Sequence, residues 1–348
     1  TKHCGQIISA PNVRKILCPN LKEKKFMVNY AVIGTSAITE KFIDGANSAG
    51  GLNLAAVCSR SAERGRAFAE KHGAKRVFTD LTEAAKSDIG AFYIASPNSA
   101  HYEQAKLLLK HKKHVLCEKT VAKNGRLVQE LCDISHENNV IFLEAIKSMF
   151  NPGAEILKTA VQRAGRISQA SFSFLQLSSR YPALMKGEIP NIFNPELEAG
   201  ALTDIGVYCL HPALYLFGEC EGFYAHCLRH TNGIDLCGDV LLKYPSVNAA
   251  VSYSKIANGG APSYITGDLG TVTIEKVSEL AGISFTDNGG NTENLCPYDK
   301  NLNYMRYEVE FFRNAVCEPQ KYAEKIHRLN KQTVAVCSLM ERIKEEQN

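Results

Sequence analysis

Short apolar runs alternate with amphipathic segments along the first half of the chain. The runs have the length of buried strands, and the segments between them repeat their apolar residues about every 3.6 positions, as helices do. We therefore predict strands at 27–33, 52–58, 90–96, 114–117 and 140–143. Helices are predicted from the turn at 34 onward and at 61–72, 99–110 and 122–137. This alternation over short loops indicates an α/β fold with a doubly wound parallel sheet.

The pattern changes near residue 151, where apolar and polar residues begin to alternate. After a helix at 154–164, such segments lie at 167–177, 222–229, 235–243, 247–255, 263–266 and 271–275. Consecutive strands without helices between them indicate a largely antiparallel sheet. A long amphipathic helix at 320–345 closes the chain. Asn330 interrupts its apolar stripe, and a division of the helix there is left open.

The two patterns divide the chain into parts. We expect a nucleotide-binding domain at 27–150 and a substrate-binding and subunit-contact domain at 151–348. Residues 1–26 precede the first strand and lack the uninterrupted apolar core of a secretory signal. A remnant of recombinant expression, a leader, or an extension that packs on the body would each explain this segment.

A phosphate-binding turn is predicted directly after the first strand, at Gly34-Thr35-Ser36-Ala37-Ile38. Backbone N–H groups and the helix dipole at such a turn bind a pyrophosphate. The usual small residues of G-x-G-x-x-G/A are represented by Gly34, Ser36 and Thr39. Ser36 keeps a small side chain but lacks the conformational freedom of glycine. The fingerprint is weak alone, and the alternation of strands and helices supports it.

The end of the second strand bears on the choice of cofactor. An acidic residue there would bind the ribose hydroxyls of NAD. This chain instead has Ser59 and Arg60, with Arg64 one turn into the following helix. Arginine offers a planar fork of donors suited to a 2′-phosphate. We therefore expect NADP(H) rather than NAD(H), and the alternative is that Arg60 is a solvated surface residue.

Two further segments carry residues suited to proton transfer, Cys117-Glu118-Lys119-Thr120 and the stretch from Gly200 to Tyr208. A tyrosine has an ordinary pKa of about 10, so a cation must stabilise its phenolate before it acts near neutrality. Lys119 is the candidate cation, and Asp204 shares a helix face with Tyr208 if the stretch is helical. Alone, each is more often a solvated lysine, a helix cap or a core tyrosine. Together they favour a site at the carboxyl ends of the strands.

An ordered set of motifs resembles the glucose-fructose oxidoreductase and inositol dehydrogenase family, also called Gfo/Idh/MocA. The motifs are Ala31–Gly34, Tyr93–His101, Val115–Lys119, Phe142–Ala145, Glu198–Tyr208 and Ile265–Gly270. The resemblance implies a Rossmann domain joined to a C-terminal α/β domain with an open mixed sheet. It also implies an NAD(P)-dependent oxidoreductase acting on a secondary alcohol or carbonyl of a sugar, polyol or cyclic diol.

The resemblance also assigns catalytic roles. Lys119 and Asp204 correspond to the family's catalytic lysine and aspartate. Tyr208 occupies a position where inositol dehydrogenase-like members carry His and dimeric dihydrodiol dehydrogenase-like members carry Tyr. Hydride transfer would then be coupled to proton transfer with Tyr208, assisted by Lys119. Thr120 departs from the family pattern, which has proline there to bias Lys119 towards an extended backbone.

Other family-based placements surround the cofactor and the substrate. Residues expected beside the cofactor are Ser96, Pro97, Asn98, His101, Glu118 and Lys119 itself. A helix-capping role for His101 is equally expected. Lys147 is expected to touch substrate. His211, one turn after Tyr208, is a candidate for binding a substrate hydroxyl, although a packed histidine is the favoured interpretation.

Composition limits the classes of partner. The chain has 348 residues, 45% of them hydrophobic, and a net charge of +4, which is too mild to indicate nucleic acid binding. No apolar run approaches the roughly 18 residues of a membrane span, so no membrane partner is expected. Twelve cysteines are scattered without a C-x-x-C pair, which favours reduced thiols and a cytoplasmic protein. No metal-ligand spacing is found, and no metal is expected.

Two other functions share this scaffold, a non-catalytic NAD(P)-binding regulator and an NAD-dependent glycoside hydrolase. A regulator needs only the dinucleotide pocket, so the joint presence of Lys119, Asp204 and Tyr208 argues against it. A hydrolase would return the hydride and leave nicotinamide absorbance unchanged. An exposed sheet face and the family resemblance lead us to expect a homodimer or a dimer of dimers.

Overall fold

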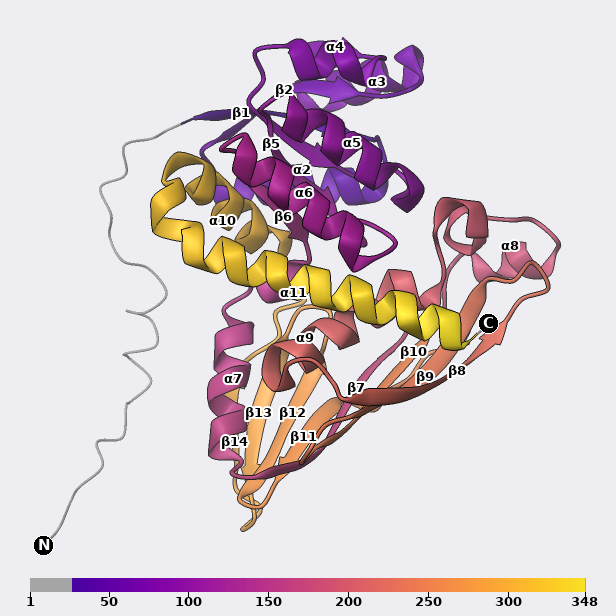
Figure 1. Cartoon of the computed structure of the whole chain (residues 1–348), viewed down its shortest axis with the longest axis vertical. Helices are drawn as coiled ribbons and strands as arrows, with labels where there is room; N and C mark the ends of the chain where they lie inside the picture. Colours follow the sequence, from indigo (N-terminus) through magenta and orange to yellow (C-terminus); the bar gives the residue numbers. More distant parts are fainter. Residues whose placement is uncertain (1–26, 348) are drawn as a thin grey trace, which may run out of the picture.

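The computed structural model describes residues 27–347, which form two sheets flanked by helices (Figure 1). Sheet A has six parallel strands in the order β3-β2-β1-β4-β5-β6. Its strands are β1 (Val28–Ile33), β2 (Leu52–Cys58), β3 (Arg76–Phe78), β4 (Ala91–Ile94), β5 (His114–Glu118) and β6 (Phe142–Ala145). The predicted Rossmann sheet is confirmed, and the carboxyl ends of its strands share one edge.

Helices cover both faces of sheet A, which is why its strands are apolar nearly throughout. The helices are α2 (Ala37–Ala49), α3 (Ala62–His72), α4 (Leu81–Lys86), α5 (Asn98–Lys110) and α6 (Gly125–Glu137). Tyr30 and Val32 of β1 pack on one side with Phe42 of α2. Ala31 and Ile33 face the other side, in the cluster that contains the leucines of α5 and α6.

Sheet B has eight strands in the order β14-β13-β12-β11-β7-β10-β9-β8. They are β7 (Ile167–Leu175), β8 (Gly222–Arg229), β9 (Asp235–Lys243), β10 (Asn248–Ser254), β11 (Ser263–Gly267), β12 (Gly270–Lys276), β13 (Ala281–Asp287) and β14 (Thr292–Cys296). Only β7 and β10 pair in parallel among these strands, so the predicted largely antiparallel mixed sheet is confirmed. Helices α7 (Gly153–Arg163) and α9 (Val207–Phe217) pack on its inner face.

Irregular segments lead into the two halves of the site. A 3-10 turn at Lys147–Met149 follows β6, and the link from β7 to α9 contains α8 (Tyr181–Met185) and 3-10 turns at Asn191–Phe193 and Pro195–Leu197. A single π-helical turn, Leu202–Gly206, then runs directly into α9.

The last two helices of the chain pack against helices that flank sheet A. They are α10 (Met305–Cys317) and α11 (Pro319–Glu346), the latter lying between the two sheets in Figure 1. The Arg313 guanidinium of α10 donates to the carbonyls of Ala49 and Gly50 at the end of α2, at 3.1 and 2.8 Å. Asn124, the N-cap of α6, donates to Glu341 of α11 at 2.9 Å. One hydrophobic cluster therefore spans both halves of the molecule.

Several elements were not predicted, and most of them are short or largely exposed. These are β3, α4, β13, β14 and α10, together with the turns between β7 and α9. The question of a division near Asn330 is answered in the negative, because α11 is continuous over that residue. The Asn330 amide instead donates to the Phe142 carbonyl of β6 at 3.1 Å, which explains a polar residue in the stripe. The predicted extension at 1–26 lies outside the described residues.

Candidate active site

Two cavities open along the carboxyl edge of sheet A and meet at Ala95 and Ser96. The first, of about 570 Å³, surrounds the turn at Gly34, and we call it the glycine-turn cavity. The second, of about 530 Å³, contains Lys119, and we call it the lysine cavity. An elongated ligand that occupies both would pass over the ends of β1 and β4, as a dinucleotide does in a doubly wound sheet.

Most of the predicted cofactor residues line the glycine-turn cavity. They are Gly34, Thr35, Ser36, Ser59, Arg60, Arg64, Ser96 and Pro97. Ile38 and Asn98 line the lysine cavity instead. Ala37, the first residue of α2, lines neither cavity, so its side chain is not part of the lining.

The backbone at Gly34 explains why the first turn needs glycine. Gly34 has φ of +106°, a conformation that side-chain-bearing residues rarely adopt. A Cβ built there would lie 2.5 Å from the carbonyl oxygen of Ala95. Ser36 is the N-cap of α2 in an extended conformation, so the helix N-terminus opens beside the cavity. This cradle fits the pyrophosphate of a dinucleotide, held by backbone N–H groups of the turn.

The far end of the glycine-turn cavity carries positive charge. Ser61 caps α3 by accepting from the Arg64 backbone N–H at 3.3 Å, which fixes the turn between Arg60 and Arg64. Both arginines are exposed beside the cavity. Lining residues that were not predicted include Thr79, Gln104, Asn191 and Leu197. The last two come from the turns before α9, and no local motif marks them.

Charged side chains of both signs line the lysine cavity. They are Lys41, Lys119, Lys147, Glu118, Asp204 and Glu279. Phe174, Gln176, Ile205, Tyr208 and Ser278 come from the second half of the chain and complete the wall facing sheet A. The predicted catalytic residues Lys119, Asp204 and Tyr208 are thus brought together in one cavity.

Asp204 holds two ammonium groups, one on each carboxylate oxygen. Lys119 Nζ lies 2.8 Å from Oδ1 and also donates to the Asp204 backbone carbonyl at 2.6 Å. Lys255 Nζ, which sequence reasoning missed, lies 2.7 Å from Oδ2. Burial alone would raise the pKa of Asp204, but the two lysines lower it well below its ordinary value. Asp204 is therefore a fixed carboxylate that orients Lys119.

A cap from sheet B shapes the turn that carries Asp204. Asp235 Oδ2 of β9 accepts from the Leu202 backbone N–H at 2.6 Å. Gly200, at φ of +116°, allows this approach, because a Cβ there would lie 1.9 Å from Asp235 Oδ1. We expected an ordinary α-helical spacing between Asp204 and Tyr208, whereas a π-helical turn precedes α9. Both side chains nevertheless line the lysine cavity.

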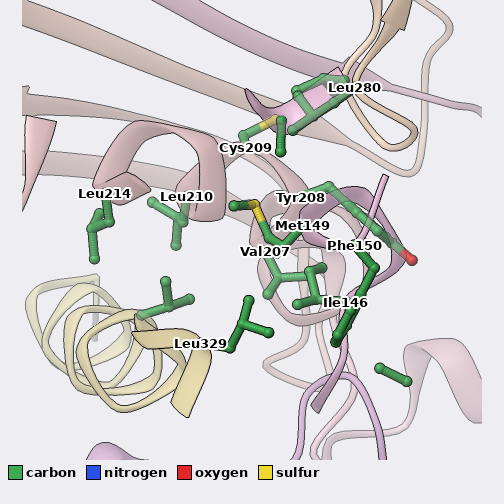
Figure 2. Packing of buried hydrophobic residues seen from close by; sticks show 14 of the residues in the cluster. Ile146, Met149, Phe150, Val207, Tyr208, Cys209, Leu210, Leu214, Leu280 and Leu329 are labelled. Atoms are coloured by element: carbon green, nitrogen blue, oxygen red, sulfur yellow. The ribbon is translucent and has the colours of Figure 1, made fainter. Parts of the chain in front are cut away.

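Tyr208 lies where the hydrophobic core meets the lysine cavity. Figure 2 shows its ring at the edge of the packed cluster, with the hydroxyl oxygen pointing away from Leu210 and Leu214. The ammonium groups of Lys119 and Lys147 lie 5.3 and 5.7 Å from its ring centroid.

The surroundings of Tyr208 hold its phenol protonated. Burial, followed by the negative charges of Glu118, Glu308, Glu279 and Asp204, raises the pKa of the hydroxyl well above its ordinary value. The phenol is therefore neutral in this geometry, and the pKa of Tyr208 is raised rather than lowered as expected beside Lys119.

The loop that carries Lys119 is fixed by several hydrogen bonds. Glu118 Oε1 accepts from the Tyr93 hydroxyl at 2.5 Å, and burial raises the pKa of Glu118. Both ring nitrogens of His101 lie near backbone carbonyls, Thr120 at 3.0 Å and Ser96 at 2.8 Å. The Lys119–Thr120 peptide bond is cis, and the Thr120 hydroxyl donates to the Thr203 carbonyl at 3.2 Å. His101 thus ties the loop to the end of β4 while lining the lysine cavity.

Lys147 forms the opposite wall with Glu279. Its Nζ lies 2.6 Å from Glu279 Oε1, and both side chains are largely buried. Glu279 comes from the hairpin between β12 and β13, and β13 was not predicted. No local sequence signal therefore pointed to this ion pair.

The structure corrects the candidate role of His211, which does not line the lysine cavity. The ring is 1% exposed and lies between α9 and α11. Its Nδ1 accepts from Gln332 at 3.1 Å, and its Nε2 is 3.2 Å from Glu144 Oε2. The packed-histidine interpretation therefore replaces substrate binding.

Metal sites and membrane spans are both absent from residues 27–347. No group of three or more His, Cys, Asp or Glu in this range is arranged to hold a metal ion. No helix in the same range is both long and apolar enough to cross a membrane.

Comparison with known families matches both halves of the chain. Residues 28–145 match the profile of an oxidoreductase family with an NAD-binding Rossmann fold, GFO_IDH_MocA. Residues 159–273 match the GFO/IDH/MocA C-terminal domain. These matches cover most of the strands that border the two cavities.

Full-length relatives extend the match. The chain is 40% identical over 299 residues to scyllo-inositol 2-dehydrogenase (NADP(+)) IolU of Bacillus subtilis, covering 86% of this chain and 91% of the relative. It is 38% identical to the uncharacterized oxidoreductase YgjR of Escherichia coli, with 84% and 89% covered. It is 26% identical to trans-1,2-dihydrobenzene-1,2-diol dehydrogenase of Xenopus laevis, with 84% and 90% covered.

Solved structures share the fold at low sequence identity. KijD10, a 3-ketoreductase from Actinomadura kijaniata in complex with NADP and TDP-benzene, superimposes with a TM-score of 0.78 at 20% identity, covering 92% of this chain and 98% of that one. This likeness concerns the fold, whereas the curated relatives fix the family. The chain belongs to the Gfo/Idh/MocA family and is an NAD(P)-dependent oxidoreductase.

Proposed function

We propose that the protein interconverts a secondary alcohol and a carbonyl of a polyol or sugar, with Tyr208 as the proton donor and acceptor and Lys119 as its electrostatic partner. The observation that carries this proposal is the convergence of Lys119, Asp204 and Tyr208 on one cavity beside the glycine turn. A bound nicotinamide supplies the hydride chemistry. The chain's own residues bind the substrate, hold the proton and stabilise charge.

In the reductive direction, the Tyr208 hydroxyl gives its proton to the substrate oxygen as negative charge develops there. The raised pKa of Tyr208 keeps that proton in place until the oxygen becomes basic. Lys119, held by Asp204 at 2.8 Å, supplies a fixed cation beside the same oxygen. In the oxidative direction, the phenolate of Tyr208 must form first. The nearby ammonium groups of Lys119 and Lys147 stabilise its negative charge.

A neutral, hydroxyl-rich substrate suits the lysine cavity. Two of its lysines are already paired with carboxylates, Lys119 with Asp204 and Lys147 with Glu279. Such pairs offer both donors and acceptors to hydroxyl groups, whereas a phosphate or carboxylate on the substrate would lie next to a carboxylate. The relative named scyllo-inositol 2-dehydrogenase makes scyllo-inositol the first compound to test.

NADP(H) is the proposed cofactor. Arg60 and Arg64 lie beside the glycine-turn cavity, and no carboxylate is among its lining residues in the described part of the chain. The IolU relative carries NADP(+) in its name, which is consistent with this choice.

A second copy of the chain is the proposed partner on the outer face of sheet B. That face exposes Tyr224 at 73%, Leu228 at 55% and Leu241 at 44%, and Tyr224 pairs with Leu241 across β8 and β9. An apolar sheet face of this kind is typical of subunit contacts. Light scattering tests it: we expect a dimer or tetramer, and Leu241→Lys should shift the mass towards monomer.

The decisive experiment is a spectrophotometric panel with NADP(H) and NAD(H). It contains scyllo-inositol, other inositols, neutral sugars, cyclic diols, dicarbonyls and phosphorylated analogues. The neutral compound with the highest kcat/KM then serves as the reference substrate for every variant. A net change in nicotinamide absorbance excludes the hydrolase alternative, and a preference for phosphorylated compounds would contradict the neutral-substrate proposal.

The role of Tyr208 is tested with Tyr208→Phe and a matched control, Tyr215→Phe, on the same helix. Removing a general acid lowers the rate by on the order of 10²-fold. We expect that loss in kcat for Tyr208→Phe, with NADPH affinity retained. Tyr215 does not line the lysine cavity, so its variant should keep the original rate. An unchanged rate in Tyr208→Phe would remove Tyr208 from the mechanism.

A further inference from the structure

Lys255 is a buried cation that no part of the proposed mechanism has yet used. It follows β10 directly, and its side chain is 10% exposed. A buried ammonium is costly unless a carboxylate and hydrogen bonds compensate it. Asp204 provides that compensation, at 2.7 Å from Lys255 Nζ.

The backbone of Lys255 is held on both sides. Its N–H donates to the Leu236 carbonyl at 2.9 Å, and its carbonyl accepts from the Ser178 N–H at 2.9 Å. These contacts continue the pairing of β10 with β9 and with the segment after β7. The ammonium group therefore projects from a rigid edge of sheet B, which is the type of support that orients a reacting group well.

The two lysines on Asp204 come from opposite halves of the molecule. Lys119 follows β5 of sheet A, whereas Lys255 follows β10 of sheet B. Oδ1 of Asp204 accepts from Lys119 and Oδ2 accepts from Lys255. The carboxylate therefore cannot rotate without breaking an ion pair. An Asp204–Lys119 pair alone would be neutral, and adding Lys255 gives the three groups one net positive charge.

We propose that Lys255 is a positioning residue that orients Asp204, and through it Lys119, and that it leaves this triad cationic beside Tyr208. The inference rests on the proposed function of Lys119 and Tyr208. A cationic triad stabilises negative charge on the substrate oxygen, whereas a neutral pair does so weakly.

Removal of Lys255 changes the behaviour of Asp204 at low pH. The charged and titratable groups that contact Asp204 or its turn are Lys119 on the loop after β5, Lys255 after β10, and Asp235 of β9. The other such groups that line the same cavity are Lys41, Glu118, Lys147, Tyr208 and Glu279. The two lysines lower the Asp204 pKa against the effect of burial. Without Lys255 that pKa rises, so Asp204 becomes protonated at a higher pH and releases Lys119.

The test compares Lys255→Met, Lys255→Gln and Lys255→Arg in the full chain, with the reference substrate and NADPH or NADP+. The control is Lys243→Met, because Lys243 ends β9 of the same sheet and is exposed. We expect kcat/KM of Lys255→Met to fall by roughly ten- to a hundredfold, the size usual for an outer partner that orients a reacting group. The acid limb of its pH profile should move to higher pH. Lys255→Arg should restore most of the rate and the original pH profile.

Stability is measured separately so that a folding defect is recognised. Lys255→Gln keeps a donor for Asp204 and loses the charge, so it serves if Lys255→Met unfolds. NADPH affinity and the unfolding temperature report on the fold, because Lys255 does not line the glycine-turn cavity. A variant with lower stability but an unmoved pH profile and rate would overturn the proposal, since Lys255 would then be only structural.

The outcomes also separate this inference from the proposed function. If Tyr208→Phe and a Lys119 variant keep the original rate, the proposed function fails, and the inference fails with it. If those variants lose activity while Lys255→Met and Lys255→Gln keep it, the inference alone is wrong.

Discussion

The two cavities are built in different ways. The glycine-turn cavity is lined mostly by short stretches at the ends of β1, β2 and β4, and its turn depends on a backbone conformation at Gly34. The lysine cavity depends on ion pairs between distant residues, Lys119 with Asp204 and Lys147 with Glu279. Under the proposed function, recognition of the cofactor is therefore encoded locally, whereas the chemistry and substrate selection depend on how the two halves pack together.

This contrast predicts that the two cavities can be damaged separately. Variants in the lysine cavity should lower turnover much more than cofactor affinity, because only one end of a dinucleotide that spans both cavities reaches it. Variants in the glycine-turn cavity should weaken cofactor binding first. Substitutions that harmed both properties equally would contradict the separation.

Lys119→Met should cause the largest loss. It removes the cation proposed to stabilise the reacting oxygen and leaves Asp204 with only Lys255. Loss of one preorganised electrostatic group lowers kcat by on the order of 10²- to 10³-fold. Steady-state kinetics with the reference substrate measure this effect, and NADPH fluorescence titration measures affinity. Lys123→Met, an exposed lysine on the same loop, is the control. A loss of NADPH affinity as large as the loss of kcat would contradict the separate roles of the two cavities.

Gly34→Ala should damage the glycine-turn cavity. The φ of +106° disfavours alanine by about 1–3 kcal/mol, and the added Cβ would press on the Ala95 carbonyl oxygen. We expect NADPH to bind roughly ten- to a hundredfold more weakly, because the turn can relieve this strain only by moving its N–H groups away from the ligand. Gly73→Ala, at a helix end with open space around it, controls for strain at positive φ. Equal weakening in both variants would show that the turn has no special role.

Arg60→Ala should affect one cofactor more than the other. A hydrogen bond to a charged group contributes about 1.5–3 kcal/mol, so the Kd for NADPH should rise by roughly 10-fold or more. The Kd for NADH should change little, because it lacks the 2′-phosphate. Arg66→Ala, on helix α3 directly after the turn that carries Arg60, is the matched control. Equal weakening of both nicotinamides in Arg60→Ala would contradict the assignment of the phosphate.

The smallest expected effect is the change of the reduction rate with pH. Burial, followed by Glu118, Glu308 and Glu279, raises the Tyr208 pKa, so the phenol stays protonated well above neutral pH. Reduction should therefore vary only a few-fold between about pH 7 and 9, while oxidation, which needs the phenolate, should rise with pH. Initial rates in both directions test this. Glu118→Gln removes the carboxylate with the strongest effect and should shift the rise in oxidation to lower pH. A reduction rate that falls steeply above neutral pH would contradict the prediction.

The sequence predicted the parts of the molecule that depend on neighbouring residues. The strands of sheet A other than β3, the turn at Gly34 and the grouping of Lys119, Asp204 and Tyr208 in one cleft were predicted, and the resemblance added catalytic roles to those three residues. Lys255 and Glu279 were not, because each acts only through a partner far away in the chain. For His211 the packed histidine was the favoured interpretation, but its partners Gln332 and Glu144 lie on other elements and could not be named from the sequence.

The closing helices limit how this protein can be dissected. Arg313 of α10 satisfies two carbonyls at the end of α2, and Gly125 of α6 lies so close to α11 that a Cβ there would press on Ser338. A fragment that ends at residue 150 would expose the apolar flanks of α2 and α6. Expression of the nucleotide-binding half alone should therefore give aggregated material, whereas a fragment pair in which residues 300–348 are supplied in trans offers a route to a soluble half.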